Sequence, residues 1–149
     1  MNKTILLVED NPDDEALTLR AVRKNMPHGI VVARDGAEAL EFLFGTGRYS
    51  GRDLTDGPLL MLLDLKLPKV NGLEVLRRTR EDARTRSIPV IVFTSSTEEQ
   101  DILDSYRLGA NSYIRKPVDY GQFCQDMKQV MNYWLCVNQL PPQRNCPTA

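Results

Sequence analysis

Short apolar runs alternate with longer amphipathic segments along the whole chain. The apolar runs predict strands over roughly Thr4 to Val8, Ile30 to Ala33, Leu59 to Leu63, Val90 to Phe93 and Ser112 to Ile114. The segments that follow them have helical periodicity and predict helices over roughly Asp13 to Asn25, Ala37 to Phe44, Leu73 to Ala83, Glu98 to Leu108 and Tyr120 to Leu135. A strand followed by a helix, five times over, predicts an α/β fold with a parallel sheet covered on both faces.

Residues with capping chemistry stand at several of the predicted helix ends. Asn11, before a proline, can cap the first helix, and Asp119 can cap the fifth. Ser96 and Glu99 have the spacing of a capping box for the fourth helix, which Gly109 can end in a left-handed conformation. Local signals and periodicity therefore predict the same layout.

Two regions add residues beyond the five strands and five helices of the predicted fold. The polar stretch Gly45 to Pro58 predicts a long surface loop. The last helix carries Met127, Met131 and Trp134, which suit either the core or a surface for self-association or for the kinase, and a proline-containing tail follows. With 149 residues and 42% hydrophobic composition, we expect one domain over residues 1–136, with 137–149 as a C-terminal tail.

The net charge bears on the kind of binding partner to expect, and the cysteines bear on the cellular compartment. The 19 basic and 20 acidic residues give a net charge of −1, which predicts no general attraction to nucleic acid or to anionic membranes. Cys124, Cys136 and Cys146 have no C-x-x-C spacing, which is typical of free thiols in the cytoplasm. The apolar run before Glu9 is too short for a membrane span or a signal peptide.

Asp64 ends the apolar run of the third predicted strand, where an unused charge would be costly. If the strands are parallel, Glu9 and Asp10 after the first strand meet Asp64 at the same edge of the sheet. Two like charges about 4 Å apart cost on the order of 4 kcal/mol at an effective dielectric constant near 20. Mg²⁺, which binds carboxylate and phosphate oxygens, is therefore the expected cofactor.

Thr94 and Lys116 end the fourth and fifth predicted strands and add a hydroxyl and a positive charge. This set of groups is suited to phosphoryl transfer, in which an oxygen nucleophile is positioned and the charge on the phosphoryl oxygens is neutralised. Asp64 would attack, the metal and Lys116 would hold the phosphoryl group, and Thr94 would donate a hydrogen bond to it.

These residues resemble the receiver domain of two-component response regulators, the chemotaxis-regulator type. The matching segments are Val8-Glu9-Asp10-Asn11, Leu62 to Pro68 with Gly72, Phe93-Thr94-Ser95 and Lys116-Pro117. The resemblance implies a doubly wound, flavodoxin-like sheet of order 2-1-3-4-5. It also implies a single-domain signalling protein that is no enzyme beyond its own Mg²⁺-dependent phosphorylation and dephosphorylation.

The resemblance also implies roles for individual residues. Asp64 corresponds to the phosphoacceptor and Lys116 to the active-site lysine. Glu9 and Asp10 correspond to the Mg²⁺-binding acids, and Lys66 would supply a backbone carbonyl ligand. Thr94 and Tyr113 occupy the positions of the family's switch pair, although a tyrosine also suits a half-exposed edge strand.

A narrower resemblance is to response regulators paired with cyanobacterial phytochromes. It rests on Asn11-Pro12-Asp13-Asp14, on the stretch Gly45 to Pro58 and on the ending Trp134 to Pro142. It implies a light-regulated histidine kinase as phosphodonor. We also expect a homodimer through the last helix and tail, and an output by protein contact.

Other interpretations remain beside these. A receiver-like scaffold that works without phosphate is the main alternative. A haloacid-dehalogenase-type phosphatase would need an Asp where Lys66 stands, and Glu9 and Asp10 would repel the phosphate of FMN in a flavin carrier. The acids Asp13, Asp14 and Glu15 are expected to serve the helix dipole. The arginines between Arg77 and Arg86 are expected to form a solvated helix face.

Overall fold

The computed structural model describes residues 4–23, 29–55 and 57–142. Its strands are β1 (Thr4–Val8), β2 (Gly29–Ala33), β3 (Leu60–Leu63), β4 (Val90–Thr94) and β5 (Ser112–Arg115). Its α-helices are α1 (Pro12–Arg23), α2 (Gly36–Phe44), α3 (Gly72–Glu81), α4 (Glu99–Arg107) and α5 (Tyr120–Asn132). A short 3₁₀ helix, η1 (Gly47–Tyr49), and a π-helical segment, η2 (Tyr133–Val137), complete the set. All five predicted strands and all five predicted helices are present, except that residues 24 and 25 of the first predicted helix lie outside the described residues.

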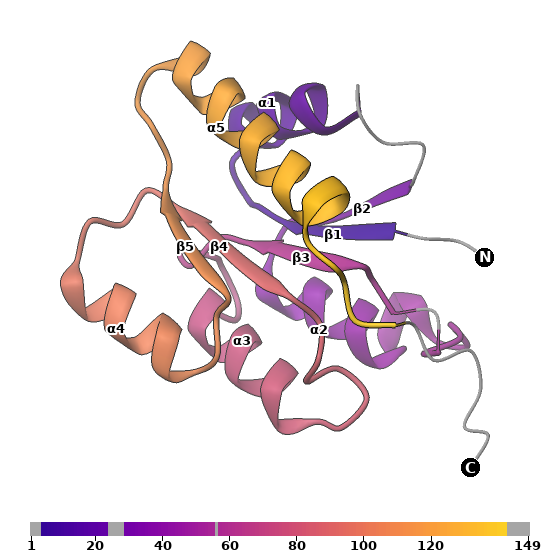
Figure 1. The fold of residues 1–149 in the computed structure, drawn as a ribbon. Coiled ribbons are helices and arrows are strands. Elements are labelled where there is room, and N and C mark those ends of the chain that lie inside the picture. The colour runs from indigo at the N-terminus through magenta and orange to yellow at the C-terminus, as the bar shows by residue number, and fades with distance from the viewer. Residues whose placement is uncertain (1–3, 24–28, 56, 143–149) are drawn as a thin grey trace.

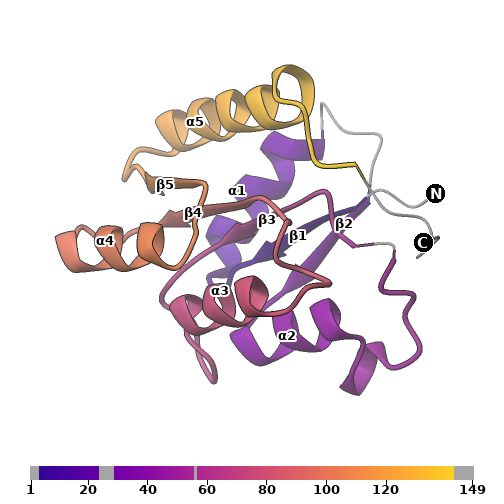
Figure 2. The same ribbon diagram turned by 60° about the horizontal axis from the view of Figure 1, so that its bottom comes forward.

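The strands form one parallel sheet of order β2-β1-β3-β4-β5, which confirms the expected flavodoxin-like topology. Helices α1 and α5 cover one face of this sheet, and α2, α3 and α4 lie on the other side (Figures 1 and 2). Strand side chains alternate between the faces, so that Leu6 and Met61 join the core beside α2 and α3. Their neighbours Ile5 and Leu60 join the core beside α1 and α5.

Three of the four predicted helix-end signals are confirmed. The side chain of Asn11 accepts hydrogen bonds from the backbone nitrogens of Asp13 and Asp14 at the start of α1. Asp119 accepts one from the backbone of the first turn of α5, and Gly109, after α4, has a φ of 98°.

The capping box predicted for α4 is wrong. Glu98 is the N-cap residue and makes no side-chain capping bond. The hydroxyl of Ser96 instead donates to the carboxylate of Asp101 and accepts from the backbone nitrogen of Glu98. Ser96 lies too early in the chain to cap the helix, because the helix begins only at Glu99.

The stretch Gly45 to Pro58, which the structure describes except for residue 56, is a loop that contacts α2. It contains η1, and Arg48 forms an ion pair with Glu38 at 2.7 Å. The guanidinium of Arg52 lies 4.0 Å from the centre of the Phe42 ring and donates to the backbone oxygen of the same residue. These contacts hold the loop against α2.

The end of the chain differs from the predicted single helix up to Leu135. Helix α5 ends at Asn132 and continues as the π-helical segment η2. Met127 and Met131 are fully buried in the core, whereas Tyr133 and Val137 are 50% and 60% exposed. Among the described residues, no helix is long and apolar enough to cross a membrane.

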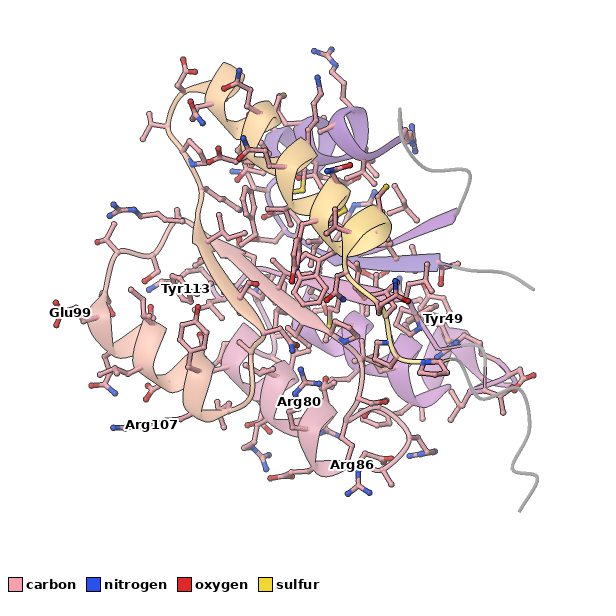
Figure 3. The ribbon with its side chains drawn as sticks, in the orientation of Figure 1. Tyr49, Arg80, Arg86, Glu99, Arg107 and Tyr113 are labelled. Carbon is pink, nitrogen blue, oxygen red and sulfur yellow. The ribbon has the colours of Figure 1, made fainter. Side chains whose placement is uncertain are left out.

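Arg80 is an exception to the predicted solvated helix face. Its neighbour Arg77 does pair at the surface with Glu74 and Glu81. The guanidinium of Arg80, however, donates to the backbone oxygens of Gly109, Arg86 and Ile88 and to the side chain of Asn111. It therefore ties α3 to the segments before β4 and β5 (Figure 3).

Candidate functional site

The carboxyl ends of the strands bring the chemically active side chains together. Val8 of β1 pairs in register with Leu63 of β3, so the residues that follow them, Glu9 and Asp64, emerge side by side. The backbone nitrogen of Asp64 donates to Val8 at 3.1 Å, and that of Lys116 donates to Thr94 at 2.8 Å. The sheet thus positions each group through its own backbone hydrogen bonds.

Three acids form the cluster predicted for a cation. One carboxylate oxygen from each of Glu9, Asp10 and Asp64 lies within 4.8 Å of the others. Glu9 and Asp64 are only 2% and 6% exposed, whereas Asp10 is exposed to solvent. Three hard oxygen donors with one open side fit a divalent cation such as Mg²⁺, which also keeps water ligands.

Lys116 places its ammonium group among carboxylates. Its Nζ atom lies 2.7 Å from Glu9 Oε1, 2.9 Å from Asp64 Oδ2 and 2.9 Å from Asp14 Oδ2. Its side chain is only 6% exposed. An ammonium group has three donors, and three carboxylates surround this one.

The pKa values of Glu9 and Lys116 are both raised, each by a different balance of burial and neighbouring charge. Burial raises the pKa of Glu9 to about 8, and the ammonium of Lys116 opposes this shift. Burial alone would lower the pKa of Lys116, but the carboxylates of Asp64, Asp14 and Glu9 outweigh it and raise that pKa above its ordinary value. Lys116 is therefore held as a cation over Asp64.

The two predicted switch residues lie on neighbouring strands beside this cluster. Thr94 is fully buried, and its Oγ1 accepts a hydrogen bond from the backbone nitrogen of Ser96 at 3.4 Å. Tyr113 extends from β5 toward α4 (Figure 3), and its hydroxyl donates to the backbone oxygen of Ser96 at 3.1 Å. Both side chains therefore contact the segment that joins β4 to α4.

Lys66 follows the acid cluster on the loop after β3. Its backbone nitrogen donates to Asp64 Oδ1 at 3.4 Å, and its side chain is exposed. That the backbone carbonyl of Lys66 binds a metal ion stays a prediction.

Asp14 is the site residue that sequence reasoning missed. We expected it to serve only the dipole of α1, yet its carboxylate reaches Lys116. The sequence offers no signal that separates it from Asp13, because both are acids in the first turn of the same helix.

The chain is similar to known proteins both at the level of a family and at the level of individual relatives. The model of the response regulator receiver domain matches residues 5–128. Two curated relatives align over most of the chain. The "Probable methanogenesis regulatory protein FilR2" of Methanothrix harundinacea is 40% identical over 138 residues, which cover 92% of this chain and 86% of that protein. Response regulator Rcp1 of Synechocystis sp. is 35% identical over 140 residues, or 93% of each chain.

Two solved structures match with a TM-score of 0.88. One is the phosphorylated cyanobacterial phytochrome response regulator RcpA, at 40% identity, with 95% of this chain and all of that chain covered. The other is the Mn²⁺-bound form of Rcp1, at 35% identity, with 94% of this chain and 99% of that chain covered.

Proposed function

This chain belongs to the family of response regulator receiver domains, and we propose that it accepts a phosphoryl group on Asp64 from a histidine kinase. The observation that carries this proposal is the contact of Lys116 with Asp64 at 2.9 Å, within a cluster of acids at the carboxyl edge of the sheet. A buried carboxylate beside a fixed cation is a positioned oxygen nucleophile.

The proposed transfer is a displacement at phosphorus. An oxygen of Asp64 forms a bond to phosphorus while the bond from phosphorus to the kinase histidine breaks, and the electron pair stays on the imidazole nitrogen. Because the other ring nitrogen carries a proton, the histidine leaves neutral. Lys116 balances the charge on the phosphoryl oxygens, and the Thr94 hydroxyl turns to donate to one of them.

Glu9, Asp10 and Asp64, with the carbonyl of Lys66, would hold a bound Mg²⁺. The cation would neutralise both the carboxylates and the incoming phosphoryl oxygens, the chemistry for which their oxygen-only donor set is suited. Mn²⁺ in the structure of Rcp1 supports a divalent ion in this type of domain.

The proposed signal leaves through Thr94 and Tyr113. When Thr94 turns toward the phosphoryl group, Tyr113 moves into the space that it vacates and gives up its hydrogen bond to Ser96. Because Ser96 also bonds to Asp101 in α4, this movement would change the surface formed by α4, β5 and α5. Phosphorylation then acts as a population shift between two states of a protein-binding surface.

A phytochrome-type light sensor is our proposed kinase. Its support is the likeness to RcpA and Rcp1 over at least 93% of this chain. We place the protein in the cytoplasm, where the free thiols of Cys124 and Cys136 stay reduced.

Self-association through the chain end is proposed from its exposed apolar residues. Tyr133 and Val137 of η2 are both at least half exposed, and Tyr133 stacks edge-on against Trp134. A second copy would cover them. Sedimentation should show a dimer that Tyr133→Ser with Val137→Ser weakens, and a monomeric wild type with and without phosphorylation would contradict this proposal.

The test of the phosphoacceptor uses Asp64→Asn, with Asp13→Asn as the matched control. Wild type and control, incubated with phosphorylated kinase and Mg²⁺, should gain a label that is acid-stable for minutes but released by hydroxylamine, the behaviour of an acyl phosphate. Asp64→Asn should gain none. Retention of hydroxylamine-sensitive label by Asp64→Asn would overturn the assignment.

The alternative is a receiver-like scaffold that works without phosphate. Binding of a phosphoryl mimic such as beryllofluoride separates the two, because the scaffold has no use for it. We expect Mg²⁺-dependent binding by the wild type and its loss in Asp10→Ala. Absence of Mg²⁺-dependent binding by the wild type would favour the scaffold.

A further inference from the structure

Asp14 stands apart from the other partners of Lys116. The ammonium contacts three carboxylates, and two of them, Glu9 and Asp64, also belong to the acid cluster suited to a cation. Asp14 is not in that cluster, although its Oδ2 lies 2.9 Å from Lys116 Nζ. Asp14 is therefore the one of the three partners that would bind neither the cation nor phosphorus during the reaction.

The position of Asp14 is fixed by the start of α1. The side chain of Asn11 accepts a hydrogen bond from the backbone nitrogen of Asp14 at 3.1 Å, and the backbone nitrogen of Asn11 donates to Glu9 at 3.3 Å. The Asp14 side chain is only 22% exposed, so solvent has limited access to its carboxylate. The first turn of α1 therefore holds the Asp14 carboxylate beside Lys116.

We propose that Asp14 is a positioning residue that holds the Lys116 ammonium beside Asp64 while the phosphoryl group is transferred. This inference rests on the proposed function. Of the three hydrogens on Lys116 Nζ, one stays with Asp14, and the other two are left for the phosphoryl oxygens and Asp64. Without Asp14, the ammonium stands at the end of a side chain with several rotatable bonds, and its remaining partners are Glu9 and Asp64, both of which belong to the acid cluster.

Asp13 provides a matched control for this role. It lies in the same first turn of α1, is also an aspartate and is exposed to solvent. Replacing either residue by alanine removes one negative charge from the helix start, and so weakens the helix dipole interaction equally. Only Asp14→Ala also removes a contact with Lys116.

The rate of phosphorylation is the first measurement, with acetyl phosphate and Mg²⁺ as the donor system. In this reaction Asp64 bonds to phosphorus while the bond from phosphorus to the acetyl oxygen breaks, and acetate leaves with the electron pair. We expect Asp14→Ala to be labelled about tenfold more slowly than Asp13→Ala, the effect of losing one charge-assisted hydrogen bond. Asp14→Glu, which restores the carboxylate, should recover most of the rate.

The second measurement does not depend on phosphorylation. Nitrogen-15 spectra of the unphosphorylated protein report how fast the Lys116 ammonium protons exchange with water. This exchange should be faster in Asp14→Ala than in Asp13→Ala, whereas mere loosening of α1 would affect both variants alike.

The two measurements separate failure of this inference from failure of the proposed function. If the wild type is labelled but Asp14→Ala matches Asp13→Ala in either rate or ammonium exchange, Asp14 does not position Lys116. If the wild type gains no label at all, the proposed function fails. Equal exchange of the Lys116 ammonium in the two variants would then still overturn the contact with Asp14.

Discussion

The α-carbon of Gly72 faces the backbone carbonyl of Asp64 so closely that a methyl group would not fit. A Cβ atom at Gly72 would lie 2.2 Å from the Asp64 oxygen and 2.6 Å from the α-carbon of Leu65. The backbone nitrogen of Gly72 also donates to Leu65 at 2.9 Å. The start of α3 is therefore packed directly against the backbone that carries Asp64.

Gly72→Ala should destabilise the protein by about 3 kcal/mol, because only backbone atoms could move away from the new methyl group. Gly57→Ala is the control, since a Cβ atom there would meet no atom within 4 Å. Urea unfolding of both variants measures the difference. A Gly72→Ala protein as stable as Gly57→Ala would contradict the close approach.

Arg80→Ala should cost about 3 kcal/mol of unfolding free energy. The change leaves the backbone oxygens of Gly109 and Ile88 without the guanidinium that they now accept from. Arg77→Ala is the matched control on the same helix, because it loses only exposed ion pairs and should cost less than about 1 kcal/mol. Equal losses in thermal unfolding would show that Arg80 is a surface residue after all.

Features that depend on short stretches of chain could be predicted from the sequence. Strands β3 and β4 are buried along their whole length, so unbroken apolar runs mark them. Asp64 and Glu9 could be placed together because parallel strands deliver their ends to one edge of the sheet. Their pairing with Lys116 followed from the same rule.

Features that depend on how distant segments meet could not be predicted. Asp14 differs from Asp13 only in its direction from α1, and that direction matters because Lys116, 102 residues later, reaches it. Arg80 differs from an ordinary surface arginine only because it donates to backbone carbonyls of the segments before β4 and β5. Those segments are distant in the sequence or lie beyond the helix, so its own surroundings in the sequence do not reveal this role. The sheet order itself came from resemblance to a family rather than from periodicity.

Asp10→Ala should weaken Mg²⁺ binding by at least about tenfold, because even partners outside the first coordination shell are typically worth that much. Asp10 is exposed at the open side of the acid cluster, so the substitution should leave the core intact. Titration calorimetry with Mg²⁺ measures the affinity, with Asp13→Ala as control. Unchanged affinity in Asp10→Ala would remove this residue from the set of ligands.

Titration of Tyr113 reports on its position beside α4. Burial raises the pKa of its phenol, opposed by the hydrogen bond to Ser96, and the charge of Asp101 adds to the increase. A raised pKa means that the folded protein holds this proton more strongly than the unfolded chain does. The stability that Tyr113 contributes is therefore complete below its ordinary pKa of about 10 and is lost as the pH rises through the folded value.

Ultraviolet absorbance of the phenolate measures this titration. The curve of the wild type minus that of Tyr113→Phe should have a higher midpoint in native protein than in urea, and Tyr106→Phe serves as a control for removing an exposed phenol of α4. If phosphorylation moves Tyr113 inward from Ser96, the native midpoint should rise further, because burial increases. A midpoint equal in native and unfolded protein would place the phenol in solvent and would argue against Tyr113 as part of the switch.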